Sequence, residues 1–390
     1  MENIQIKILD NKQVVVFTGK IASDNAEQIQ DFVYPQLDGG KEIVFDFDKV
    51  DYISSSGLRF VLKVAKSFKD FKVINLSPAV HEIFEITGFT SLVKTEKALR
   101  EISVAGKEII GEGYIGRVYR LDPDTIAKVV YREYGLDDIR REVGLSKKAF
   151  VAGIPTAIPF DVVKVKEGGY GAVYELLKSE CFNKLFINHP EDEDKNVALY
   201  IKLLKKIMSI KLDDPTLPRK IDEAKRWVND LKKFDVFDIP TLEKLEKLVN
   251  TIPDLDNFVH GDYHIKNIMM EGDEPLLIDM DTIGCGHPIF ELSGFYLTYI
   301  GYPSTDAGNC KAFLGIDDRV AQRLFYDSMN EVYKDKTEEE RNQIIDKIAL
   351  LGYMWLAWKT LLFEPENTKR LYHSRDVVLS LIDKYDTLNF

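Results

Sequence analysis

Val259-His-Gly-Asp-Tyr-His-Ile-Lys-Asn-Ile-Met-Met270, followed after a short turn by Leu276-Leu-Ile-Asp-Met-Asp-Thr282, is the stretch that decides the fold of this 390-residue chain. A site that transfers a phosphoryl group needs a carboxylate to orient and deprotonate the attacking hydroxyl, and oxygen ligands to hold Mg²⁺ against nucleotide phosphates. Asp262 is placed for the first role, and Asn267 and Asp279 are placed for the second. The stretch therefore indicates phosphoryl-transfer chemistry.

The spacing of these residues has a structural reason. Asn267 follows Asp262 by five positions, so a tight loop directs both side chains into one cleft. The apolar runs 268–270 and 276–278 predict a β-hairpin that returns Asp279 to the side of Asn267. The simpler alternative is a His-Gly-Asp turn followed by an unrelated hairpin.

The stretch closely resembles the His-Gly-Asp-x-His-x-x-Asn and Ile-Asp-x-Asp signatures of the aminoglycoside phosphotransferase and choline kinase superfamily, which shares the bilobal α+β protein-kinase fold. The resemblance covers about residues 106–390. It implies that Asp262 is the catalytic base and that Asn267 and Asp279 are Mg²⁺ ligands. It also implies that Asp281, the second acid of the motif, touches the metal through water or contacts the substrate.

Other residues near this stretch receive roles from the same resemblance. His260 and His264 are expected to support the catalytic loop, and Glu291 stands where the superfamily usually has an aspartate that braces it. Lys266 is placed to neutralise the transferring phosphoryl group, as an arginine at that offset does in tyrosine kinases. A solvated surface lysine is the alternative for Lys266.

A glycine-rich segment precedes the catalytic loop, in the order that a kinase-like fold requires. Gly111, Gly113 and Gly116 form a Gly-x-Gly-x-x-Gly pattern flanked by apolar residues. This pattern predicts a hairpin whose backbone amides face the nucleotide phosphates. Glycine triplets also serve ordinary turns, so the pattern alone is weak.

Lys128 lies inside the apolar run 125–131, where burying a charge without a partner is costly. Glu142, in a predicted helix, is the expected partner, and the pair would position the α- and β-phosphates. The alternative is a lysine that extends from a sheet edge and a solvated glutamate. The next buried strand, 171–177, has the position of the hinge, so backbone groups from Glu175 to Leu177 are the expected adenine contacts; an ordinary core strand fits the same pattern.

The segment after Asp279 is short, because only eight residues separate it from Pro288. Peptide-binding kinases have a much longer segment here, so the length favours a small-molecule substrate. Helices within 191–250 and 311–390 would wall a pocket for it. Trp355 and Trp358 would share one helical face, with core packing favoured over substrate stacking.

The first hundred residues carry no kinase signature and alternate strands with helices, which predicts a mostly parallel or mixed sheet with helical cover. The expected strands are 14–18, 42–47 and 73–76, and the expected helices are 23–36, 55–68, 79–86 and about 95–102. The end of that last helix places the junction at 102–106. The predicted organisation is a domain at 1–102, a kinase-like small lobe at 103–178 and a mostly helical large lobe at 179–390.

Two motifs, Asp51-Tyr-Ile-Ser-Ser-Ser-Gly57 and Ser77-Pro-Ala-Val-His-Glu-Ile-Phe84, resemble the STAS domain of anti-sigma factor antagonists. The resemblance implies an α/β fold and a phosphorylation site at Ser55, where the helix N-terminus would stabilise a phosphate. Ser54 and Ala22 replace two acids expected around that site. A STAS fold used as an interaction or dimerisation module is therefore the alternative to a phosphorylation switch.

Composition limits the partners and the location. The net charge of −12 argues against nucleic-acid and anionic-membrane partners, and three scattered cysteines suggest neither disulfides nor a zinc site. The N-terminal residues lack the apolar core of a signal peptide, and no run has the length of a membrane helix, so we expect a cytoplasmic protein.

These observations predict an ATP- and Mg²⁺-dependent phosphotransferase for a small-molecule hydroxyl, with a STAS domain for regulation, partner binding or self-association. Two alternatives remain open. One is a protein kinase that modifies Ser55 or a partner protein, and the other is a non-catalytic nucleotide sensor. The sequence does not identify the substrate, the nucleotide preference or the oligomeric state.

Overall fold

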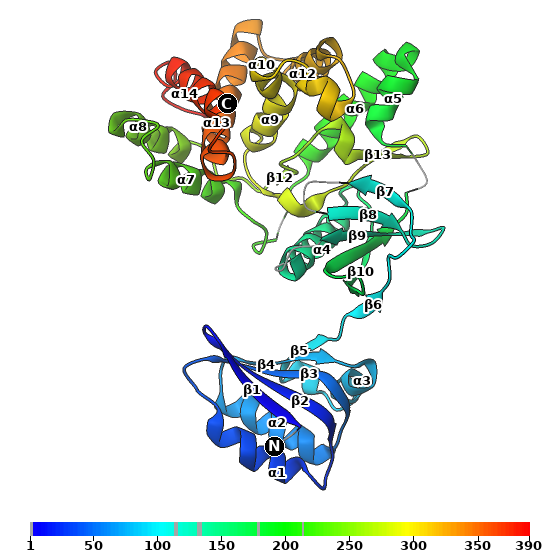
Figure 1. Ribbon diagram of the computed structural model, residues 1–390. Helices are drawn as coiled ribbons and strands as arrows, with labels where there is room; N and C mark the ends of the chain where they lie inside the picture. Colours follow the sequence, from blue (N-terminus) through cyan, green and yellow to red (C-terminus); the bar gives the residue numbers. More distant parts are fainter. Residues whose placement is uncertain (1–2, 113–115, 131–134, 178–179, 213) are drawn as a thin grey trace. The chain divides into compact units, whose positions relative to one another are not determined.

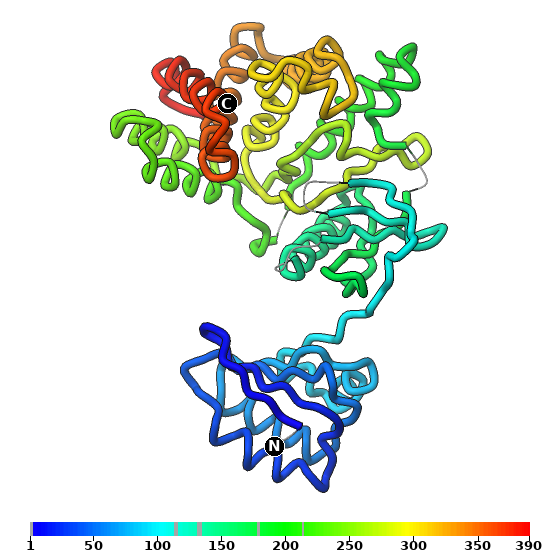
Figure 2. The backbone as a smooth tube through the Cα atoms, viewed as in Figure 1, coloured from blue at the N-terminus to red at the C-terminus, as the bar shows by residue number. Residues whose placement is uncertain are grey.

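The computed structural model describes residues 3–112, 116–130, 135–177, 180–212 and 214–390. The chain divides into two compact units, Met1–Ser103 and Val104–Phe390 (Figure 1). The chain trace in Figure 2 ends among the helices of the second unit. None of the helices in these described ranges combines the length and the apolar character needed to cross a bilayer.

The first unit is built on a five-stranded sheet in the order β1-β2-β3-β4-β5, with β1 antiparallel to β2 and the other neighbours parallel. Its elements are β1 (Ile4–Leu9), β2 (Lys12–Ile21), α1 (Ala26–Val33), β3 (Glu42–Ile53), α2 (Ser55–Ser67), β4 (Phe71–Leu76), α3 (Pro78–Ile86) and β5 (Lys94–Lys97). Phe17, Phe45 and Phe47 are almost fully buried at the centre of its core. The predicted mixed sheet with helical cover is confirmed.

The expected helix at about 95–102 is wrong. The structure has β5 there, followed by a short strand, β6 (Arg100–Ile102). Sheet pairing overrides the local pattern, because β5 runs parallel to β4 and Lys72 pairs with Glu96 across the two strands at 3.6 Å. The sequence pattern also left out β1, whose alternating isoleucines form an edge strand.

The smaller lobe of the second unit contains an antiparallel sheet in which the strands follow the order β10-β11-β9-β8-β7. Its elements are β7 (Ile109–Glu112), β8 (Gly116–Arg120), β9 (Thr125–Val130), α4 (Gly135–Val151), β10 (Pro159–Val165) and β11 (Tyr170–Glu175). The register puts Lys128 of β9 between Val118 of β8 and Ala172 of β11. Ile139 and Val143 of α4 pack in the same apolar cluster as Ala172, so the helix covers one face of this sheet.

The larger lobe is mostly helical and shares one continuous apolar core. Its helices are α5 (Phe182–Asn188), α6 (Glu193–Ser209), α7 (Lys220–Leu231), α8 (Ile239–Asn250), α9 (Ile289–Tyr296), α10 (Tyr302–Thr305), α11 (Asn309–Leu314), α12 (Asp318–Val332), α13 (Glu338–Phe363) and α14 (Thr368–Leu381). Two small strand pairs join β12 (Phe258–Val259) to β15 (Gly284–Cys285) and β13 (Ile268–Glu271) to β14 (Glu274–Leu277). Together the lobes confirm the predicted bilobal α+β class.

Short helical turns complete the chain and frame the motif region. They are η1 (Tyr34–Gln36), η2 (Phe89–Ser91), η3 (Pro190–Asp192), η4 (Ile265–Asn267), η5 (Met280–Thr282) and the π-helical turn η6 (Leu297–Gly301). The turns η4 and η5 flank the hairpin β13–β14, so both acidic motifs lie at the same end of it.

Candidate active site

The loop after β12 holds Asp262 in a defined orientation. Asn267 Nδ2 donates to Asp262 Oδ2 at 2.9 Å and to the Asp262 carbonyl at 3.0 Å, and His264 Nε2 lies 3.4 Å from the same carboxylate oxygen. Burial acts to raise the pKa of Asp262, but the hydrogen bonds from His264 and Asn267 and the nearby imidazoles of His264 and His260 together outweigh it and lower the pKa below the ordinary value. With a side chain 47% exposed, the carboxylate is ionised and accessible.

Glu291, in the first turn of α9, holds this loop through hydrogen bonds to its backbone. The fully buried carboxylate accepts the backbone N–H of His260 at 2.5 Å and of Gly261 at 3.3 Å. Burial raises the pKa of Glu291 to about 7, although the two amide donors act to lower it. Thr282 Oγ1 donates to the His260 carbonyl at 2.7 Å, which ties the loop to the segment after Asp279.

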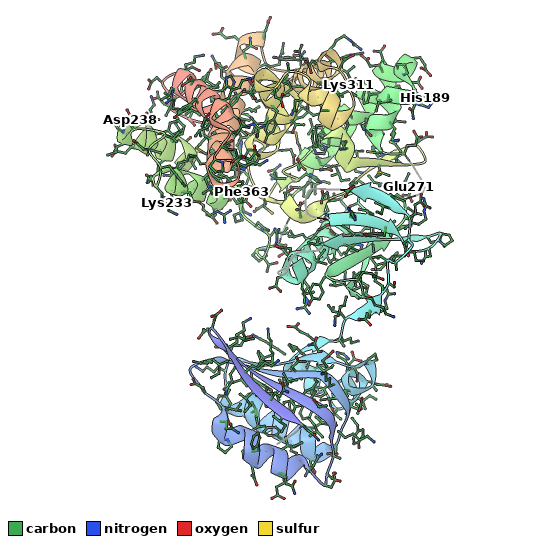
Figure 3. All side chains as sticks on the ribbon, viewed as in Figure 1. His189, Lys233, Asp238, Glu271, Lys311 and Phe363 are labelled. Atoms are coloured by element: carbon green, nitrogen blue, oxygen red, sulfur yellow. The ribbon has the colours of Figure 1, made fainter. Side chains whose placement is uncertain are left out.

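The hairpin β13–β14 brings the second acidic motif back to the first, as its apolar runs predict. The backbone N–H of Ile278 donates to the Asn267 carbonyl at 2.9 Å, so the next residue, Asp279, is brought close to Asn267. Figure 3 labels Glu271, the last residue of β13. Asp279 has a left-handed backbone conformation, with φ of 66°. Such a conformation is unfavourable for a residue other than glycine and occurs often at functional sites.

A network of three charges joins the two lobes of this unit. Lys128 Nζ donates to Glu142 Oε1 at 2.9 Å and to Asp279 Oδ1 at 2.7 Å. Burial acts to lower the pKa of Lys128, but the charges of Glu142 and Asp279 outweigh it and raise the pKa. Tyr174 donates its hydroxyl to the same Glu142 oxygen at 3.0 Å, which fixes the carboxylate on α4.

Asp281 lies near this network but makes a different contribution. Burial and the negative charge of Asp279 raise the pKa of Asp281 to about 6. Arg141 of α4 donates to the Asp281 carbonyl at 2.9 Å, which holds η5 against the smaller lobe. The site therefore combines the Asp262 carboxylate, whose pKa is lowered, with the Asp281 carboxylate, whose pKa is raised.

A cavity of about 380 Å³ opens between the lobes of the second unit beside this network. Of the residues singled out from the sequence, its lining includes Gly111, Lys128, Glu142, Glu175, Leu177, Lys266 and Asp279. The volume falls in the range of about 300–1,000 Å³ that is usual for small-molecule and cofactor sites. Gly113 lies outside the described residues, and Asp262, Asn267, Asp281 and Gly116 are not in the lining.

Backbone contacts hold Gly116 and the hinge in place in the smaller lobe. A Cβ atom on Gly116 would lie 2.0 Å from the Val129 carbonyl oxygen, so only glycine fits where β8 meets β9. At the hinge, the Leu176 N–H donates to the Asp124 carbonyl at 2.8 Å. Lys266 Nζ lies 5.0 Å from the ring centroid of Phe313, facing the larger lobe.

The described residues contain no cluster of three or more His, Cys, Asp or Glu side chains that holds a metal alone. Mg²⁺ in nucleotide sites is usually bound by one or two carboxylates together with substrate phosphates, so a protein-only cage is not required. Asn267 directs its amide nitrogen to Asp262, which leaves the amide oxygen as an available ligand. Asn267 and Asp279 therefore offer the donor set that a nucleotide-bound Mg²⁺ needs.

Several cavity residues carried no sequence signal. Thr156, Ala157 and Met269 line the cavity, and Thr156 reaches it through a parallel bridge to Leu277, which is distant in the sequence. Trp358 packs on Trp227 at 6.0 Å between ring centroids, in agreement with the core-packing interpretation. These contacts depend on tertiary pairing, which local patterns do not show.

In the first unit, Ser55 is the exposed first residue of α2. The residue that caps the helix is Ser54, whose Oγ accepts the Gly57 N–H at 3.3 Å. The Ser55 hydroxyl is thus separate from the cap.

Each of the two units matches a known protein family. Residues 3–102 match the STAS domain, and residues 108–324 match the phosphotransferase enzyme family, APH. A Bordetella bronchiseptica protein named as an anti-sigma factor antagonist, BtrV, is 36% identical over 104 residues, which cover 25% of this chain and 90% of that protein.

Solved structures of a thermostable mutant of aminoglycoside phosphotransferase APH(4)-Ia are similar in fold. The apo form has a TM-score of 0.50 at 11% identity and covers 78% of this chain and 98% of that one. A variant of the same enzyme, in a ternary complex with ADP and hygromycin B, also has a TM-score of 0.50 at 11% identity, covering 78% and 97% of the two chains. Because the APH match spans more than half of the 390 residues, the chain belongs to the phosphotransferase enzyme family and carries an N-terminal STAS domain.

Proposed function

We propose that the chain is an ATP- and Mg²⁺-dependent phosphotransferase that moves the γ-phosphoryl group to a hydroxyl of a small molecule. The observation that carries the proposal is the Lys128 ammonium, held between Glu142 and Asp279 at the wall of a 380 Å³ cavity. The solved complex of APH(4)-Ia with ADP and hygromycin B supports a nucleotide and a small-molecule acceptor. The STAS domain serves regulation or partner binding.

The nucleotide side of the proposed site uses the cavity. Lys128 pairs with the α- and β-phosphates, while backbone amides at Gly111 and Gly116 face them. Backbone groups from Glu175 to Leu177 contact adenine. Asn267 and Asp279, with Asp281 nearby, are the residues that would hold Mg²⁺, and the ion would neutralise phosphate charge.

The transfer step is assigned to the catalytic loop. Asp262 accepts a hydrogen bond from the acceptor hydroxyl, orients it toward the γ-phosphorus and takes its proton as the new bond forms. The lowered pKa of Asp262 keeps it in the basic form at neutral pH. Lys266, on the cavity side of the loop, stabilises the charge that develops on the transferring group.

Substitution of Asp262 and Asp279 separates the proposed roles. Asp262→Asn should lower turnover by about 10²-fold or more and leave Mg-ATP affinity unchanged, because it removes only proton acceptance. Asp279→Ala should weaken Mg-ATP binding more than binding of metal-free ATP. Asp273→Asn, at the exposed tip of the same hairpin, is the matched control and should resemble the wild type. Normal turnover by Asp262→Asn, or unchanged Mg-ATP affinity in Asp279→Ala, would contradict the assignments.

A further inference from the structure

The side chain of Lys266, in the catalytic loop between Asp262 and Asn267, is placed by an aromatic ring. Its ammonium lies 5.0 Å from the ring centroid of Phe313, within the roughly 6 Å at which a cation and an aromatic face attract each other. Lys266 also lines the cavity proposed to hold the nucleotide. In the parts of the chain that the structure describes, no carboxylate lies within ion-pair distance of it. Its charge is therefore available to a phosphate group.

The backbone around Lys266 is fixed independently of this ring. The Ile265 N–H donates to the Tyr299 hydroxyl at 3.0 Å, and Cys181 Sγ donates to the Lys266 carbonyl at 3.4 Å. The side chain, in contrast, is long and exposed, so without a partner it would populate many rotamers. The contact with Phe313 restricts these rotamers and directs the ammonium.

Phe313 is itself held by the catalytic loop. Its ring and the imidazole of His264 lie 5.1 Å apart between centroids at an interplanar angle of 86°, the edge-to-face arrangement that aromatic pairs favour. His264 is buried, and its Nε2 lies 3.4 Å from Asp262 Oδ2. One ring therefore contacts both Lys266 and the imidazole beside the proposed base.

The helix that carries Phe313 is anchored in the larger lobe. Cys310 and Leu314 of α11 are buried in its core, and the Leu314 carbonyl accepts a hydrogen bond from Asn183 Nδ2 of α5 at 3.0 Å. Phe313 lies between these anchors in the sequence and is 43% exposed. The core therefore fixes α11 through its other side chains, and the Phe313 ring remains free to contact the catalytic loop.

We propose that Phe313 is a positioning residue for phosphoryl transfer, because its ring holds the Lys266 ammonium where it pairs with the γ-phosphoryl group. The inference rests on the function proposed above. In the transfer, the acceptor hydroxyl oxygen bonds to the γ-phosphorus, the bond from that phosphorus to the β,γ-bridging oxygen of ATP breaks, and ADP leaves. The hydroxyl proton passes to Asp262. Phe313 touches none of these atoms, but a lysine already in place stabilises the developing charge without reorganisation.

The inference is tested by kinetics on the full chain. The acceptor is the compound that the wild type labels in a small-molecule cell extract with Mg²⁺ and γ-labelled ATP, identified by mass. Phe313→Leu keeps an apolar side chain but removes the ring, so kcat at saturating acceptor and Mg-ATP should fall about three- to tenfold, while both KM values stay close to wild type. Phe313→Tyr keeps the ring and should retain the wild-type kcat.

Tyr372→Leu is the matched control and should keep the wild-type kcat. Tyr372, on α14 of the same lobe, is 50% exposed, and the Arg375 guanidinium lies 4.8 Å from its ring centroid, but it does not line the cavity. A loss of kcat in Tyr372→Leu equal to that in Phe313→Leu would overturn the inference.

A double-mutant cycle separates positioning of Lys266 from a general effect on the fold. Lys266→Met should lower kcat about tenfold or more, the usual loss for a charge-assisted contact. Phe313→Leu should add little to that loss, because the ring then has no ammonium to hold. If Phe313→Leu failed to fold, Phe313→Met, which also lacks a ring, would serve in the same cycle.

The outcomes distinguish this inference from the proposed function. Wild-type kcat in Phe313→Leu, or the same fold loss from Phe313→Leu with and without Lys266, would overturn the positioning role and leave the proposed function standing. Label in no metabolite with the wild type would count against the proposed function and overturn the inference with it.

Discussion

At the scale of single residues, the site depends on where Lys128 is held. The sequence predicts its contact with Glu142, because a charge inside an apolar strand needs a partner and the next helix supplies one. It does not predict the contact with Asp279, which is 151 positions away in the sequence. That contact requires the hairpin β13–β14 and the left-handed conformation of Asp279, which no local pattern encodes.

Glu142→Gln tests whether the charge on α4 positions Lys128. Without that charge we expect Lys128 to remain with Asp279, so that the dissociation constant for Mg-ATP rises about tenfold, as expected for loss of a charge-assisted hydrogen bond. The measurement is nucleotide binding by calorimetry. Tyr174→Phe is the control, since it removes the hydrogen bond that a neutral hydroxyl donates to the same oxygen and keeps the carboxylate charge. Equal affinities of the two variants would contradict this role.

At the scale of elements, the hairpin and the helical blocks follow from apolar periodicity, whereas β5 and β6 do not. The segment 94–97 is polar and short, and it becomes a strand because β4 pairs with it in parallel. A smaller pocket lined by Glu223, Trp227 and Trp355 has the same origin, since these residues come from α7 and α13, whose pairing the sequence does not specify. These features depend on tertiary contacts, which local sequence patterns do not encode.

Gly116→Ala and Gly111→Ala should differ strongly although both change the glycine-rich segment. The new Cβ at Gly116 would lie 2.0 Å from a backbone oxygen of β9, so the strands must separate. At Gly111 it would lie 3.5 Å from Val118, an ordinary contact. We expect Gly116→Ala to cost about 1–3 kcal/mol of stability and to weaken Mg-ATP binding. Equal thermal unfolding curves for the two variants would contradict a stability cost from the close approach of residue 116 to the Val129 carbonyl.

The pairing of α6 with α12 should make stability depend on acid pH. Hydrogen bonds from Arg319 and Arg323 lower the pKa of Glu193 to about 2 from 4.5. The folded state thus binds the proton less tightly than the unfolded state, so this stabilisation is present above pH 4.5 and is lost as pH falls toward 2. Because Arg319 is largely exposed, we expect about 1–2 kcal/mol after solvent screening.

Urea unfolding of Glu193→Gln between pH 5 and pH 2.5 measures this dependence. The variant should lose less stability than the wild type over that range. Glu331→Gln is the control, because Glu331 and Lys205 join the same two helices with both side chains exposed. A Glu193→Gln profile parallel to that of the wild type would contradict the assigned pKa.

At the scale of the whole molecule, the sequence predicts the order and class of the two units correctly. Each family resemblance rests on motifs within one unit, and each unit has its own apolar core. Neither motif predicts how the STAS domain affects the phosphotransferase domain, because that relation depends on binding partners and conformational states rather than on packing.

Phe45→Ala tests whether the two cores unfold as separate units. Phe45 is fully buried, with ring centroids of Phe17 and Phe71 at 4.9 Å, so the substitution should destabilise the first unit by about 3–5 kcal/mol. Calorimetry should show one transition lowered by Phe45→Ala and a different one raised by Mg-ATP. Phe32→Ala, at a partly exposed position of α1, should shift the first much less. A single transition that responds to both changes would contradict independent cores.

The most direct test of the proposed activity is the destination of the phosphoryl group. Wild type and Asp262→Asn are incubated with Mg²⁺, γ-labelled ATP and a small-molecule cell extract, and protein is then separated from metabolites. We predict label in a metabolite with the wild type and none with the variant. Label confined to the protein, with Ser55 the first position to map, would contradict a small-molecule kinase and indicate protein phosphorylation instead.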